Sequence, residues 1–150
     1  MCGIAGFISK KISKDDLTKM TNSLAHRGPD ADGLYYDIEK GVGLGHRRLS
    51  IIDLSSGANQ PMKSHCGRYI MVYNGEVYNY KEIANEIKPS RWNTKSDTEV
   101  ILEAFVKWNT KFVHKLNGMF AIAIYDLKKN KLFLFRDRMG IKPMYYYIYG

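Results

Sequence analysis

The sequence contains few cysteines and no long apolar run. Only Cys2 and Cys66 are present among 150 residues, which is too few for a disulfide framework or for a zinc site made of cysteine pairs. No apolar run reaches the roughly 20 residues of a membrane-spanning helix. Ser9-Lys10-Lys11 also interrupts the N-terminal apolar residues before they reach signal-peptide length. These absences argue against secretion, membrane insertion and a metal site, and they predict a cytoplasmic protein.

Internal repeats, low-complexity segments and domain linkers are also missing from the sequence. Hydrophobic residues make up 45% of the 150 residues. A chain of this length and composition can bury a core without disulfide or metal support. The sequence therefore predicts one globular domain.

Negative charge is scarce relative to positive charge. The chain has 23 Lys and Arg against 15 Asp and Glu, a formal net charge of +8, and a pI near 9.4. Such a balance can mark a nucleic-acid-binding protein. The basic residues are scattered, however, and the densest group, residues 128–131, is typical of a hairpin turn between apolar strands. Nucleic-acid binding therefore rests on charge alone, and we expect no nucleic-acid partner.

The hydrophobic pattern predicts helices between strands that are buried on both faces. A helix is expected over about residues 14–25, because Ser13 can cap it and apolar residues follow at helical spacing. Two more helices are expected, over residues 81–87 and from Ser96 onward. Strands are expected over residues 34–49 with a glycine-rich turn, 68–73, 118–125, 132–135 and 144–149. This alternation indicates sheet layers covered by helices.

Cys2 becomes the N-terminal residue if Met1 is removed. Its thiol and a free α-amine would then share one residue, as a nucleophile with its own general base. An α-amine titrates near pH 7.7–8.0, so it is a better base at neutral pH than an ordinary lysine. The alternative is that Cys2 is only a small buried apolar residue.

Four further sites could carry chemistry or serve the fold alone. Arg48 lies beside an apolar segment, so its guanidinium requires a carboxylate from the protein or from a ligand. Asn74-Gly75 is either a hairpin turn or a pair of donors for an oxyanion. Asp97 either caps a helix or binds an ammonium group. The turn at residues 26–30 is either a charged surface turn or a loop over a site.

Six motifs together resemble one family from end to end. They are Met-Cys-Gly-Ile at 1–4, His-Arg-Gly-Pro-Asp at 26–30, Gly-His-Arg-Arg-Leu-Ser-Ile-Ile-Asp at 45–53, Tyr-Asn-Gly-Glu-Val-Tyr-Asn at 73–79, Ser-Asp-Thr-Glu at 96–99 and Arg-Asp-Arg-Met-Gly-Ile-Lys-Pro at 136–143. In this order they resemble the glutaminase domain of glutamine-hydrolysing asparagine synthetases. These enzymes are class II glutamine amidotransferases and belong to the N-terminal-nucleophile (Ntn) hydrolases.

The resemblance implies an α+β fold with four layers. In this αββα Ntn-hydrolase sandwich, two antiparallel sheets lie between helical layers. Family members continue with further strands, a helix and an ATP-dependent synthetase domain. The chain ends at Gly150, so the resemblance predicts that residues 1–150 form a glutaminase domain that is incomplete at its C-terminus and lacks the synthetase domain.

The resemblance also implies a reaction and a set of site residues. Cys2, freed of Met1, would attack the side-chain amide of L-glutamine and form a thioester, releasing ammonia and then glutamate. The oxyanion hole would consist of Asn74 and the Gly75 N–H. The substrate carboxylate would bind Arg48 and backbone groups as far as Ile52, and its ammonium would bind Glu76 and Asp97. The loop at residues 26–30 would close over the substrate.

Partners and the fate of the ammonia also follow from the resemblance. ATP and Mg²⁺ are expected only in the synthetase domain, so the glutaminase domain needs no cofactor. The ammonia would serve asparagine synthesis from aspartate, or alternatively amidation of a sugar carboxylate in polysaccharide biosynthesis. A homodimer is compatible with the family. A catalytically silent binding module is a further alternative, although it would have no reason to keep the complete residue set.

Overall fold

The computed structural model describes residues 2–89 and 91–149. The expectation about Met1 therefore lies outside the described residues.

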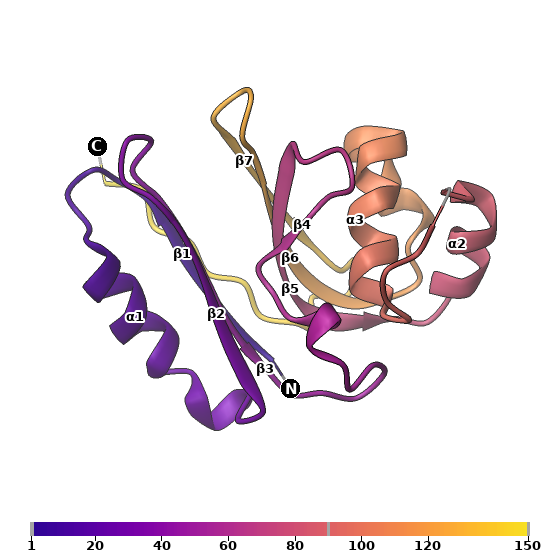
Figure 1. The fold of residues 1–150 in the computed structure, drawn as a ribbon, viewed down its shortest axis with the longest axis horizontal. Coiled ribbons are helices and arrows are strands. Elements are labelled where there is room, and N and C mark those ends of the chain that lie inside the picture. The colour runs from indigo at the N-terminus through magenta and orange to yellow at the C-terminus, as the bar shows by residue number, and fades with distance from the viewer. Residues whose placement is uncertain (1, 90, 150) are drawn as a thin grey trace.

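Figure 1 shows four successive layers: α1, a first sheet, a second sheet, and α3 with α2. The strands are β1 (Gly3–Ile8), β2 (Ala31–Asp37), β3 (Val42–Arg48), β4 (Met62–Lys63), β5 (Tyr69–Val77), β6 (Gly118–Asp126) and β7 (Lys131–Arg136). The helices are α1 (Lys14–Asn22), α2 (Tyr80–Ile87) and α3 (Asp97–Trp108), with the 3-10 turns η1 (Ala25–Arg27), η2 (Ser56–Ala58) and η3 (Asn109–Lys115).

The first sheet is antiparallel and has the strand order β1-β3-β2. α1 packs on its outer face and begins with the capping box that the sequence predicts at Ser13. The Ser13 hydroxyl accepts from Asp16 N–H at 3.2 Å, and the Asp16 carboxylate accepts from Ser13 N–H at 3.0 Å. The helix approaches β3 closely, since a Cβ on Gly45 would lie 1.9 Å from the Thr21 hydroxyl. Gly45 therefore allows α1 to reach the sheet.

The second sheet is also antiparallel and has the order β4-β5-β6-β7. α3 and α2 cover its outer face (Figure 1). Phe105 of α3 packs edge-on against Phe112, with ring centroids 5.4 Å apart. The buried residues of this core are Met62, Met71, Tyr73, Val77, Ile83, Val100, Ile101, Leu102, Ala104, Phe105, Phe112, Leu116, Phe120, Ile122 and Ile124.

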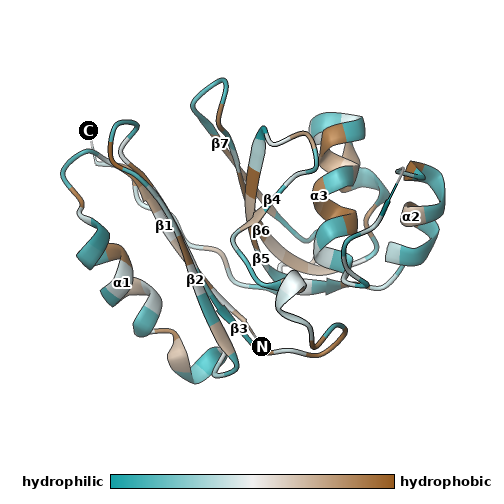
Figure 2. Cartoon of the chain, in the orientation of Figure 1, coloured by the Kyte–Doolittle hydropathy of each residue, from teal (hydrophilic) through white to brown (hydrophobic). Residues whose placement is uncertain are grey.

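The inner faces of the two sheets meet in a second, smaller core. Its buried residues are Val42, Leu44, Ile70, Val72, Ala123 and Tyr125. Figure 2 shows apolar segments along the strands and a hydrophilic β6–β7 turn. Both faces of the second sheet are therefore covered, and the predicted α+β arrangement of two antiparallel sheets between helical layers is confirmed. None of the helices formed by residues 2–89 and 91–149 has the length and apolar character that a membrane crossing requires.

Three predictions differ from the structure. The glycine-rich turn expected at residues 41–45 is mostly strand, because β3 begins at Val42. The helix expected over residues 14–25 ends at Asn22, and the separate turn η1 follows, because the chain must turn before Gly28-Pro29. The strand expected over residues 144–149 is wrong. This segment forms no ladder with any strand of the described chain, and Tyr145, Tyr146 and Tyr147 are exposed. A tyrosine-rich pattern favours a strand only where a partner backbone is available.

The charged pair Arg68 and Asp126 joins the ends of β5 and β6. Arg68 Nε and Nη2 donate to the two carboxylate oxygens at 2.9 and 2.6 Å. These charge-assisted bonds lower the pKa of Asp126 to about 2. The pair should therefore stabilise the fold wherever the carboxylate is ionised.

We expect Asp126→Asn to lower the free energy of unfolding by about 1–3 kcal/mol at pH 7, because Arg68 loses a charged partner. The difference between wild type and variant should be complete above the unfolded pKa, near 3.8, and should disappear as the pH falls through about 2. Denaturant unfolding at several pH values measures it. A difference that stays constant down to pH 2 would contradict the assigned ion pair.

Candidate active site

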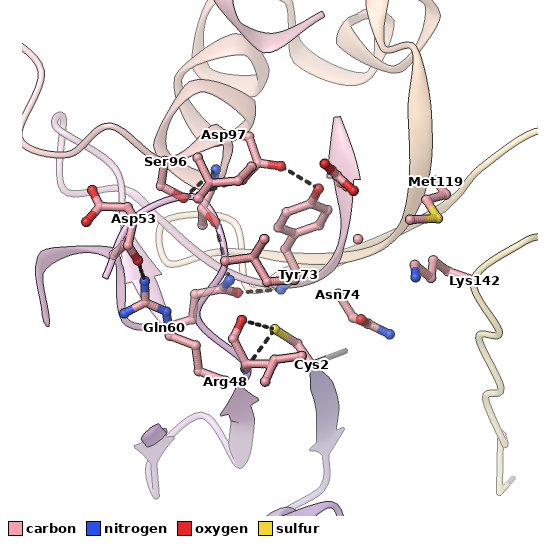
Figure 3. Close-up of a pocket in the computed structure, with 17 residues that line it drawn as sticks. Cys2, Arg48, Asp53, Gln60, Tyr73, Asn74, Ser96, Asp97, Met119 and Lys142 are labelled. Atoms are coloured by element: carbon pink, nitrogen blue, oxygen red, sulfur yellow. Dashed lines mark hydrogen bonds between the residues drawn. The ribbon is translucent and has the colours of Figure 1, made fainter. Parts of the chain in front are cut away.

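A pocket lies where β1, β3 and β5 meet the N-terminus of α3 (Figure 3). All the residues that the sequence predicts for the site line it: Cys2, Arg48, Ile52, Asn74, Gly75, Glu76 and Asp97. They come from segments as far as 95 positions apart in the chain, from Cys2 to Asp97. The fold therefore brings the predicted set together in one place.

Cys2 immediately precedes β1, and its sulfur rests against the end of β3. The thiol lies 3.7 Å from the carbonyl oxygen of Leu49, and Leu49 N–H donates to the sulfur at 3.4 Å. Arg27 Nε donates to the Cys2 carbonyl oxygen at 3.3 Å. These contacts fix the backbone of Cys2 and leave its side chain half-buried at the pocket.

The segment at residues 26–30 supports the site without lining the pocket. Arg27 holds Cys2, and the Asp30 carboxylate accepts from Ser50 N–H at 2.7 Å. Asp30 N–H donates in turn to the Arg48 carbonyl oxygen at 3.0 Å. The segment thus ties Cys2 to the loop after β3. The sequence identified its importance, but the structure assigns it contacts to the protein itself.

Arg48 is the last residue of β3 and is 7% exposed. Its guanidinium donates to the carbonyl oxygens of Asp53 and Ser55 and to Asn59 Oδ1, the last at 2.7 Å. It forms no ion pair within the described residues, so of the two alternatives left open, a protein carboxylate is wrong and a ligand carboxylate stays a prediction. Three of its five N–H donors hold the loop after β3, and the other two have no partner among residues 2–89 and 91–149.

The exposed edge of β5 supplies the backbone of the site. Asn74-Gly75 lies inside a continuous ladder with β6, so the hairpin alternative is wrong. Residues in an antiparallel strand point their N–H and C=O groups alternately to either side. Tyr73, Gly75 and Val77 therefore face away from β6, where β4 has already ended.

The backbone N–H groups of this edge have hydrogen-bond partners on both sides of Gly75. Tyr73 N–H donates to Gln60 Oε1 at 2.6 Å, and Val77 N–H donates to Asp97 Oδ2 at 3.1 Å. The Gly75 N–H between them has no partner in the described part of the chain. The Asn74 amide lines the pocket and likewise has no partner there. Two donors are therefore available at the pocket wall.

His46 of β3 fixes the same edge from the opposing sheet. Its Nε2 lies 3.2 Å from the Tyr73 carbonyl oxygen, so this nitrogen carries the proton, while buried Nδ1 has no partner among the described residues. Burial lowers the pKa of His46 to about 4. The imidazole is neutral near pH 7, and it connects the two sheets beside Asn74.

Asp97 lies at the start of α3, and its carboxylate is not the helix cap. Ser96 is the N-cap, and its hydroxyl accepts from Thr98 N–H at 3.1 Å. Asp97 Oδ2 instead accepts from the Tyr73 hydroxyl at 2.8 Å and from Val77 N–H. Burial raises the pKa of Asp97, and these hydrogen bonds oppose that effect. The carboxylate is thus directed to the pocket, as Figure 3 shows.

Glu76 and Ile52 complete the predicted set. Glu76 is half-buried at the pocket and makes no hydrogen bond or ion pair within the described residues. Ile52 lies on the loop after β3, and its side chain is 38% exposed.

The sequence analysis missed four residues of the site: Gln60, Tyr73, His46 and Lys142. Their roles depend on contacts between distant segments. Membership of a motif could have indicated Tyr73, His46 and Lys142, whereas Gln60 lies outside the six motifs.

Comparison with known proteins agrees with this geometry. Residues 1–150 match the family model for a glutamine amidotransferase domain over their whole length. The chain belongs to this family. It is therefore a member of an enzyme family whose activity is amide transfer from glutamine.

Among residues 2–89 and 91–149, no group of three or more His, Cys, Asp or Glu side chains could hold a metal ion.

Two curated relatives cover nearly the whole amidotransferase domain. A putative asparagine synthetase [glutamine-hydrolyzing] 2 of Methanocaldococcus jannaschii is 41% identical over 98% of this chain. Asparagine synthetase [glutamine-hydrolyzing] 2 of Bacillus subtilis is 42% identical over 97% of it. The matched regions make up 32% and 20% of those relatives. The chain thus spans about a fifth to a third of their length.

A solved structure supports the fold independently. Glutamine phosphoribosylpyrophosphate amidotransferase from B. subtilis, complexed with ADP and GMP, superposes with a TM-score of 0.70 at 19% sequence identity. The match covers 95% of this chain and 38% of that one. This amidotransferase domain therefore has the layered fold of a known glutamine amidotransferase.

Proposed function

We propose that this domain hydrolyses the side-chain amide of L-glutamine through a thioester at Cys2. One observation carries the proposal: the Cys2 thiol, the Asn74 amide and the Gly75 N–H line a single pocket with Arg48, Glu76 and Asp97. A nucleophile, an oxyanion site and binding groups for a zwitterion are together what the reaction requires. A silent binding module would need only the last of these.

The proposed substrate position follows from the charges of the pocket. The two remaining donors of Arg48 would bind the substrate carboxylate, because a guanidinium and a carboxylate can pair through two parallel hydrogen bonds. Glu76 and Asp97 offer anions to the ammonium, and backbone groups up to Ile52 complete the carboxylate site. With both ends of the amino acid held, its side-chain amide points toward Cys2.

The proposed chemical steps begin at the thiol. After removal of Met1, the α-amine of Cys2 takes the thiol proton, and the sulfur attacks the amide carbon. The carbonyl electron pair moves to oxygen, which the Asn74 amide and the Gly75 N–H stabilise. The amine then protonates the leaving ammonia, and water hydrolyses the thioester to glutamate.

The acceptor of the ammonia is proposed from the relatives. Because two of them are named glutamine-hydrolysing asparagine synthetases, we propose that the ammonia serves asparagine synthesis from aspartate. ATP and Mg²⁺ would bind a synthetase domain that works with this one, so the glutaminase domain itself would need no cofactor. We further propose a cytoplasmic location, where free thiols persist.

The test of the proposed function is ammonia release from glutamine. Purified protein, shown by intact mass to lack Met1, should form glutamate and ammonia in equal amounts from glutamine and neither product from D-glutamine. A sample that retains Met1 is the matched control, since its Cys2 nitrogen is an amide and not a base. Equal rates with and without Met1 would contradict the proposal.

Asp97→Asn should mainly raise KM for glutamine. The asparagine oxygen can still accept from Tyr73 and Val77, but the charge opposite the ammonium is lost. We expect KM to rise about 10- to 100-fold with kcat within a fewfold of wild type. Steady-state kinetics measures this split, and the melting temperature controls for folding. An unchanged KM with a reduced kcat would assign Asp97 to the chemistry or to the fold.

A further inference from the structure

The segment after β7 places a lysine in the pocket, and the steps above do not use it. Lys142 is 2% exposed and lines the pocket with Cys2, Asn74 and Met119. Lysine is rarely buried in proteins because its ammonium loses hydration. A surface segment could instead direct such a side chain to water. Lys142 instead lies in the lining of the pocket, where its positive charge can act on bound groups.

A set of charge-assisted hydrogen bonds fixes the backbone on both sides of Lys142. The Asp137 carboxylate accepts from the N–H groups of Ile141 and Lys142 at 2.8 and 2.9 Å. Arg136 Nε donates to the Lys142 carbonyl oxygen at 2.8 Å, and its Nη2 donates to the Gly140 carbonyl oxygen at 2.6 Å. Asp137 is itself 5% exposed. The charged residues of the motif at 136–143 thus hold the turn that delivers Lys142.

The charges of bound glutamine do not require Lys142. In the proposed function Arg48 binds the substrate carboxylate, while Glu76 and Asp97 bind its ammonium. Negative charge also appears during the reaction, first on the sulfur and then on the amide oxygen. Figure 3 shows Arg48 and Lys142 on opposite sides of Cys2, with Asn74 on the Lys142 side. The second cation of the pocket lining therefore lies on the side of Asn74, the group proposed to bind the oxyanion.

We propose that the Lys142 ammonium stabilises the Cys2 thiolate and the oxyanion of the tetrahedral intermediate, as a third group beside Asn74 and Gly75. The sulfur electron pair forms the C–S bond, the carbonyl pair moves to oxygen, and Lys142 keeps its proton throughout. Its positive field favours both anions, more strongly than it would in bulk water, because Lys142 itself is buried. The oxyanion part rests on the proposed function, whereas the thiolate part does not require glutamine.

The test compares Lys142→Met, Lys142→Arg and Lys128→Met in a Cys66→Ser background. Methionine keeps most of the side-chain volume without charge, and arginine keeps the charge. Lys128 is an exposed lysine of the β6–β7 turn and controls for net charge. The replacement of Cys66 leaves Cys2 as the only thiol. The rate of alkylation by iodoacetamide against pH reports the thiolate, and glutaminase kinetics reports kcat and KM.

Lys142→Met should raise the midpoint of the alkylation profile by about one pH unit. It should lower kcat about 10- to 100-fold with KM within about threefold. Lys142→Arg should recover most of both effects, and Lys128→Met should change neither. An unchanged profile and kcat in Lys142→Met would overturn the proposal. Equal loss of kcat in the Met and Arg variants, with no shift in alkylation, would also overturn it by indicating a packing role.

The two readouts separate this inference from the proposed function. If the wild-type protein releases no ammonia from glutamine, the glutaminase proposal fails. A shifted alkylation profile in Lys142→Met would then still assign Lys142 to the thiolate, and an unshifted one would remove that assignment as well.

Discussion

Cys2→Ala should lower ammonia release from glutamine by more than about 10⁴-fold, because the thioester cannot form without the sulfur. Residues that bind the substrate remain, so glutamine should still raise the melting temperature of the variant. The measurement is coupled detection of glutamate over hours at high protein concentration. The fold should be little affected, since the half-buried Cys2 thiol has only weak contacts with Leu49.

Cys66→Ser is the matched control for Cys2→Ala. Cys66 is the second thiol of the chain, and it is exposed and does not line the pocket. Its replacement should leave kcat and KM unchanged. Comparable loss in both variants would show that the chemistry does not depend on an N-terminal thiol, and this would contradict the proposed mechanism.

Asn74→Ala should reduce kcat about 10²- to 10³-fold while KM changes little. The Asn74 amide is assigned to the oxyanion, which exists only after attack. Removing the amide should therefore weaken stabilisation of the transition state and leave substrate binding unchanged. The side chain has no partner in the described part of the chain. Its removal should therefore cost the fold little, and the melting temperature should stay within a few degrees.

Two comparisons sharpen the Asn74 experiment. Asn74→Asp keeps the shape but puts an anion where negative charge forms, so it should be no more active than Asn74→Ala. The Gly75 N–H remains in both variants and should preserve a residual rate well above that of Cys2→Ala. A large rise in KM with normal kcat would instead place Asn74 in ground-state binding.

Local signals predicted much of the fold. The Ser13 cap, the apolar runs of β5 and β6 and the turn before β7 were all readable because each depends on neighbours in the sequence. The segment at 144–149 was mispredicted for the opposite reason. Strand propensity is local, whereas a ladder needs a second backbone. That segment forms no ladder with a strand in the described chain.

The sequence predicted which residues form the candidate site, but it did not predict how they contact one another. The resemblance supplied Cys2, Arg48 and Asp97. It could not show that three N–H donors of Arg48 bind the loop after β3. The roles of His46 and Lys142 were hidden because each depends on a contact across the sheets or around the pocket. The Asn-Gly pair was ambiguous until the ladder with β6 placed it inside β5.

The thioester at Cys2 is the central claim, and acid-quenched intact mass spectrometry tests it most directly. Protein lacking Met1 is mixed with glutamine, quenched within the first turnover and weighed. The proposed mechanism predicts a transient gain of one γ-glutamyl group, mapped to Cys2 by digestion and absent from Cys2→Ala. Ammonia release at a normal rate from Cys2→Ala, or an adduct at Cys66 in place of Cys2, would contradict it.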